Sequence, residues 1–86
     1  MPEISRFYGI IIYLVTGDHN PPHIHDDYSG DEAVFDILTG TMAAGKIPTR
    51  AKKMVQLWIS MHHDELVADW NFAVKNQPIF KITPLK

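Results

Sequence analysis

Hydrophobic and polar residues follow two different periods along the chain, and the change falls near Pro48. From Arg6 to Val15 apolar residues occupy both faces, as in a strand buried on both sides at the centre of a sheet. Residues 23–28 and 32–38 alternate between apolar and polar side chains, as strands with one buried face do, and residues 41–44 predict a short further strand. The turns between these segments are too short for crossovers, so the first half predicts an antiparallel meander of three or four strands.

The second half of the chain follows a helical period. Apolar residues recur three and four positions apart from Ala51 onward and again after the His62–Glu65 interruption, which predicts two helices. The hydroxyl of Thr49 is expected to cap the first helix and the carboxylate of Asp64 the second. One bent helix across residues 49–75 fits the same pattern.

The order of the elements, strands before helices, predicts an α+β fold with both helices packed on one face of the sheet. Trp58 and Trp70 are expected to supply much of that contact, since each indole can bury on the order of 200 Å². Pro78 ends the helical pattern, and residues 79–82 predict either a last strand or an extended tail. A chain of 86 residues makes one domain, so residues 1–86 are interpreted as a single α+β domain.

The composition narrows the class of protein. The chain has no cysteine, so it has neither a disulfide nor a thiolate metal site. Apolar residues make up 45% and charged residues 21% of it, a globular mix that argues against disorder. The longest apolar run, residues 9–15, is too short to span a bilayer, and no signal peptide precedes it. These features predict a cytoplasmic protein.

Charged residues are segregated along the chain. Residues 18–36 contain six acidic and no basic residues, whereas residues 46–53 contain four basic and no acidic residues. The formal net charge is −2, while a dedicated nucleic-acid binder usually carries a basic excess. The pattern indicates an acidic surface that carries histidines and a separate basic helix start.

The stretch from Asp18 to Asp27 carries three of the five histidines of the chain. His23 and His25 are spaced i, i+2, which places both rings on one face of an extended strand, and two prolines stiffen the turn that follows His19. Three imidazoles gathered in this way can hold Zn²⁺ or another divalent transition metal. Asp18 or Asp27 would then serve as a further ligand or orient a ring.

Other interpretations of the same residues stay open. His19, His23 and His25 are also candidate catalytic residues, because two imidazoles on one face can act as base and acid at neutral pH. Metal-free RNA cleavage needs such a pair plus a cation for the phosphate, and the local acidity counts against an RNA substrate. The candidate cations are Arg6, Arg50 and Lys52. In a structural interpretation the histidines bond backbone carbonyls and the chain is a protein-interaction module.

Six segments of the chain share a recognisable pattern, of which Asp-His-Asn-Pro-Pro-His-x-His is the most specific part. The segments are Met1–Ile10, Asp18–His25, Glu32–Val34, Gly45–Pro48, Glu65–Leu66 and Asp69–Trp70. Together they resemble a bacterial domain-of-unknown-function family, the one numbered 4160.

The resemblance implies a small bacterial protein, and members of the family are often proposed to act in toxin–antitoxin-like gene pairs. It implies an effector that is either RNase-like or metal-dependent, with RNA or a protein encoded nearby as the partner. The alternative is a non-enzymatic interaction module in which the histidine motif is structural. No catalytic or metal-binding residue follows from the resemblance. An exposed sheet edge adds the expectation of a homodimer.

Overall fold

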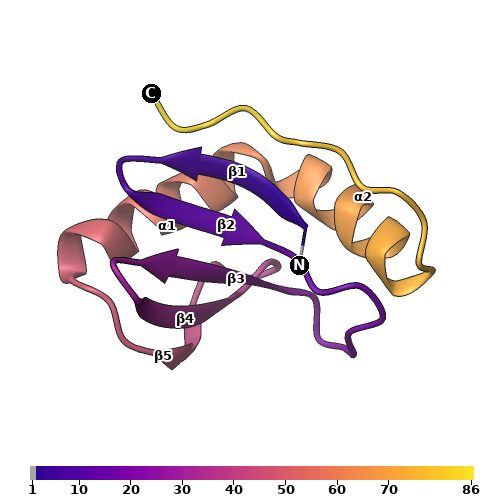
Figure 1. Ribbon diagram of the computed structural model, residues 1–86, viewed down its shortest axis with the longest axis horizontal. Helices are drawn as coiled ribbons and strands as arrows, with labels where there is room; N and C mark the ends of the chain where they lie inside the picture. The colour runs from indigo at the N-terminus through magenta and orange to yellow at the C-terminus, as the bar shows by residue number, and fades with distance from the viewer. Residues whose placement is uncertain (1) are drawn as a thin grey trace.

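The computed structural model describes residues 2–86 and consists of a five-stranded sheet with two helices on one of its faces (Figure 1). The strands are β1 (Glu3–Phe7), β2 (Ile10–Tyr13), β3 (His23–Tyr28), β4 (Asp31–Asp36) and β5 (Met42–Gly45), and the helices are α1 (Thr49–Met61) and α2 (His63–Val74). Each strand pairs antiparallel with its neighbour in sequence, in the order β1-β2-β3-β4-β5. The α+β class and the meander are confirmed, whereas the expected count of three or four strands is wrong.

The additional strand comes from the apolar segment 6–15, which the sequence pattern predicted as one central strand. This segment folds into a hairpin in which Phe7 lies opposite Ile10. Tyr8 and Gly9 turn the chain with φ angles of 49° and 80°. Glycine adopts positive φ at little cost but tyrosine rarely does, so this dipeptide is a weak turn signal. As a result β1 is an edge strand, and β2 lies between β1 and β3.

The helices α1 and α2 are separate, because the backbone at His62 (φ −121°, ψ 27°) ends one and begins the other. The single bent helix is therefore wrong, and so are the expected caps. Pro48 and His62 occupy the N-cap positions, and neither makes a side-chain capping bond within residues 2–86. Thr49 and Asp64 lie in the first turns, where the charge of Asp64 complements the helix dipole. Within the same residues, no helix is long and apolar enough to cross a membrane.

The hydrophobic core lies between the sheet and the two helices. Ile12, Ile24 and Phe35 belong to neighbouring strands and are fully buried. Trp58 is fully buried and Trp70 is 3% exposed, which confirms that the indoles pack in the core. Within residues 2–86, no helix lies on the opposite face of the sheet (Figure 1).

The chain after α2 forms an extended tail and not a sixth strand. It runs beside β1, where the amide of Ile82 donates to the carbonyl of Ile4 at 2.8 Å (Figure 1). The Trp58 indole N–H donates to the Thr83 carbonyl at 2.9 Å, and the Phe80 amide donates to the Asp69 carboxylate at 3.0 Å. The side chain of Ile82 is buried in the core. The tail therefore covers the outer edge of β1.

A carboxylate is buried in the core beneath the centre of the sheet. Asp26 lies opposite Ile12 on one side and Ala33 on the other, and its side chain is fully buried. Among residues 2–86, neither of its oxygens has a hydrogen-bond partner. Burial disfavours the charged form and raises the pKa of Asp26 to about 6.

Asp26→Asn is expected to change how the stability of the protein depends on pH. Because the pKa of Asp26 is raised on folding, the native state binds the proton first, and the wild type gains stability as pH falls through about 6. The variant lacks this gain, so the wild type should improve relative to it by about 1 kcal/mol between about pH 7 and about pH 5. Urea denaturation of both proteins at the two pH values measures this. An equal difference at both pH values would contradict it.

Candidate metal centre

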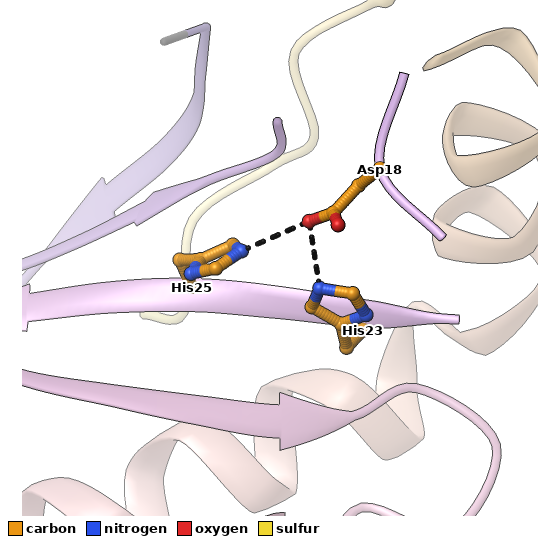
Figure 2. Close-up of side chains that lie close together, drawn as sticks. All are labelled: Asp18, His23 and His25. Carbon is orange, nitrogen blue, oxygen red and sulfur yellow. Dashed lines mark hydrogen bonds and ion pairs between the residues drawn. The ribbon is translucent and has the colours of Figure 1, made fainter. Parts of the chain in front are cut away.

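Three potential metal ligands meet beside the open face of the sheet (Figure 2). Asp18 comes from the loop between β2 and β3, and His23 and His25 come from the first half of β3. The Nε2 atoms of His23 and His25 lie 2.8 and 3.3 Å from the same Asp18 oxygen, Oδ2. One ligand atom from each residue lies within 4.8 Å of the other two. We refer to Asp18, His23 and His25 as the triad.

Local structure fixes each member of the triad. Strand alternation places His23 and His25 on the face opposite the buried Ile24. The loop that carries Asp18 is attached to α2, because the amide of Gly17 donates to the carbonyl of Ala73 at 3.0 Å. The other end of the loop is attached to the sheet, where the amide of Ile37 donates to the carbonyl of Pro22 at 3.0 Å. The Asn20–Pro21 peptide bond between these attachments is cis.

The hydrogen bonds of His23 define which of its nitrogens is free to bind a cation. Nδ1 lies 2.7 Å from the carbonyl oxygen of Pro21, and a carbonyl only accepts, so Nδ1 carries a proton. Nε2 faces a carboxylate oxygen of Asp18, which also offers only lone pairs. Nε2 is therefore the ring nitrogen of His23 that a cation shared with Asp18 would bind.

The carboxyl group of Asp18 carries the negative charge that a metal ligand needs. Burial alone would raise the pKa of its carboxyl group, but hydrogen bonds from His19, His25 and His23 outweigh this and hold the pKa well below its usual value. Asp18 is thus ionised at neutral pH, as a metal ligand has to be. The triad side chains are 13–24% exposed, so the site is partly desolvated yet open to a ligand from solvent.

The triad has room for a metal ion. Zn–N and Zn–O distances of about 2.0–2.1 Å at tetrahedral angles separate neighbouring ligand atoms by roughly 3.3–3.4 Å. The edge between His25 and Asp18 already has this length, at 3.3 Å. The edge between His23 and Asp18, at 2.8 Å, would have to lengthen by about half an ångström. Three protein ligands would leave at least one coordination position open.

Two of the residues that the sequence suggested as ligands lie outside the triad. The ring of His19 contacts Asp18 Oδ1 at 2.9 Å, but its side chain is 90% exposed, and Oδ1 is not the oxygen that His23 and His25 share. Asp27 lies two residues beyond His25 on the same strand, and its carboxylate accepts a hydrogen bond from the amide of Gly30 at 3.0 Å. Asp27 therefore stabilises the β3–β4 turn.

Arg6 and the two remaining histidines of the chain make contacts outside the triad. Arg6 is paired with Glu3 at 2.7 Å, on the surface of β1. His62 contacts Glu65 at 2.7 Å and His63 contacts Asp64 at 3.3 Å, both near the start of α2. These histidines do not belong to the triad.

Sequence reasoning missed two aromatic neighbours of the triad. The Tyr13 ring stacks on the His25 ring, with centroids 5.3 Å apart and an angle of 13° between planes. The Trp70 ring lies 5.0 Å from the ring of His23. Tyr13 follows from the register, since it lies opposite His25, but the register could not be derived without the Tyr8–Gly9 turn. No signal in the sequence places Trp70 beside His23.

Comparison with known proteins identifies a family but no characterised relative. The sequence model of one family, "Domain of unknown function (DUF4160)", matches residues 9–71, well over half of the chain. No curated protein and no solved structure matches it. The matched range contains the entire triad together with Tyr13 and Trp70. The chain therefore belongs to the DUF4160 family.

Proposed function

We propose that this protein binds a divalent transition-metal ion through Asp18, His23 and His25. The observation that carries the proposal is the convergence of two imidazole nitrogens on one carboxylate oxygen, at 2.8 and 3.3 Å. The proton on His23 Nδ1 leaves Nε2 as the metal-binding atom, in the arrangement that carbonyl-bonded histidine ligands adopt.

The donor set indicates the class of metal. Two imidazoles and one carboxylate suit Zn²⁺, Fe²⁺, Co²⁺ or Ni²⁺, whereas Ca²⁺ and Mg²⁺ prefer sites built from oxygen ligands alone. A metal held by three ligands with an open position would act as a Lewis acid on whatever molecule binds there. The chain itself orients the ligands, through Pro21, Tyr13 and Trp70.

A second candidate function is acid–base cleavage of RNA, as the effector of a toxin–antitoxin-like pair. The side-by-side rings of His23 and His25, with centroids 5.1 Å apart, favour it. The charge of the same sheet face speaks against it, because Asp27, Glu32 and Asp36 would repel a phosphate backbone. Expressing the chain without a partner, with RNA integrity and growth as readouts, tests this function.

The proximity of Trp70 to His23 allows a direct test of metal binding. Ni²⁺ added to the protein is expected to quench the fluorescence of Trp70, whose ring is 5.0 Å from the ligand ring. Calorimetry on the same samples should give one ion per chain, and binding should weaken in acid, because metal ligands have to be deprotonated.

Two matched variants make this test specific. Trp70→Phe should abolish most of the quenching while calorimetry still detects the ion, and Trp58→Phe should leave the quenching in place. Mg²⁺ should neither quench nor bind. Absence of Ni²⁺, Co²⁺ and Zn²⁺ binding by calorimetry would refute the metal function.

A further inference from the structure

A small hollow adjoins the triad on the open face of the sheet. It has a volume of about 150 Å³ and is lined by Pro21, His23, Val34, Asp36 and Ala43. His23 belongs both to the triad and to the wall of the hollow. Val34 lies opposite His25, and Asp36 lies opposite His23, so the hollow extends from the triad across β4 toward β5. Two larger hollows, of about 360 Å³ each, are lined by other residues.

The walls of this hollow are suited to an apolar group. Pro21, Val34 and Ala43 contribute carbon atoms. Both ring nitrogens of His23 are engaged, with Pro21 and Asp18, so the ring presents carbon to the hollow. Asp36 Oδ1 accepts the amides of Leu38 and Thr39, at 2.7 and 3.0 Å. The hollow therefore offers few free hydrogen-bonding groups to an occupant.

We propose that the hollow is the subsite for the aliphatic arm of a ligand whose polar end binds the metal of the triad. This inference rests on the proposed function and names the chemical class of the ligand. With ~30 Å³ for each group of the size of water or a methylene, the hollow takes about four or five carbons. Because Asp36 and the nearby Glu32 are acidic, the arm is neutral or cationic and not anionic.

A series of chelating probes tests the subsite. Straight-chain alkyl hydroxamates, which bind metals through two oxygens, are titrated into the Co²⁺-loaded protein and followed by its visible absorption. Affinity is expected to rise about twofold to threefold for each added methylene until the hollow is full, somewhat below the fourfold expected for complete burial. Longer chains should then bring no further gain.

Two leucine variants on β5 test whether the hollow causes the dependence of hydroxamate affinity on chain length. Ala43→Leu places a side chain in the hollow and should abolish the dependence on chain length, while the affinity for Co²⁺ itself stays unchanged. Ala44→Leu is the matched control, because Ala44 is also exposed on β5 but does not line the hollow. This variant should keep the dependence on chain length.

The outcomes separate the subsite from the metal centre. A wild-type chain that takes up no Co²⁺ would refute both. Two results would refute the subsite but not the metal centre. The first is normal Co²⁺ uptake with a hydroxamate affinity that does not change with chain length. The second is an equal dependence of that affinity on chain length in the wild type and the Ala43→Leu variant.

Discussion

Alanine at both His23 and His25 is expected to lower the affinity of the protein for Zn²⁺ at least about a hundredfold, because residues that merely orient a ligand already cost about 10–100-fold when they are lost. Asp18→Asn should have a comparable effect, since it keeps the shape of the side chain but removes the charge that the metal needs. Calorimetry against a competing chelator measures the affinities, and circular dichroism shows whether each variant keeps the native fold.

His19→Ala is the control for this prediction, since the exposed His19 ring contacts the other oxygen of Asp18. It is expected to lower the Zn²⁺ affinity clearly less than the double variant does, because the 90% exposed His19 ring orients Asp18 and is not itself a ligand. Equal, weak uptake by the wild type and the double variant would remove the metal centre. A loss in His19→Ala as large as in the double variant would instead place the His19 imidazole among the ligands.

Gly45→Ala is expected to cost at least about 3 kcal/mol of unfolding free energy, a large effect for a single methyl group. Gly45 has a φ of +84°, and an added Cβ would meet the carbonyl oxygen of Glu32 and lie 2.6 Å from the Cα of Ala33. Both obstacles are backbone atoms of β4, which cannot move without breaking the ladder between β4 and β5. Urea denaturation measures the loss.

Gly40→Ala separates the steric cost from the cost of the backbone angle. Gly40 has a similar φ of +76°, but among the described residues no heavy atom lies within 4 Å of its added Cβ. This variant should lose only about 1–2 kcal/mol, the cost of a left-handed alanine. Equal losses in the two variants would show that β4 yields to the methyl group at position 45.

The architecture could largely be predicted because its elements have clear periods. The alternation in residues 23–28 and 32–38 and the helical spacing from Ala51 correspond to β3, β4 and α1. The hairpin of β1 and β2 could not be predicted, because Tyr8 adopts a positive φ that a tyrosine rarely takes. The position of the last segment depends on a tertiary hydrogen bond to Ile4, which no local pattern contains.

The candidate site, like the fold, could be predicted only in part from the sequence. The i, i+2 spacing of His23 and His25 is enough to place both rings on one face, and the structure has them there. Asp27 shares that face, but each pair of residues advances a strand by about 6.6 Å, which carries Asp27 away from the rings. The central position of Asp18 depends on how the loop is attached to α2 through Gly17 and Ala73, residues distant in sequence.

The tail has a consequence for where this domain begins and ends. The family model matches residues 9–71, yet β1 and the buried Ile82 both lie outside this range. A fragment trimmed to the matched range would expose the flank of β2 and leave the indole N–H of Trp58 without its Thr83 acceptor. The part of this chain that packs together is therefore longer than the part that the family model matches.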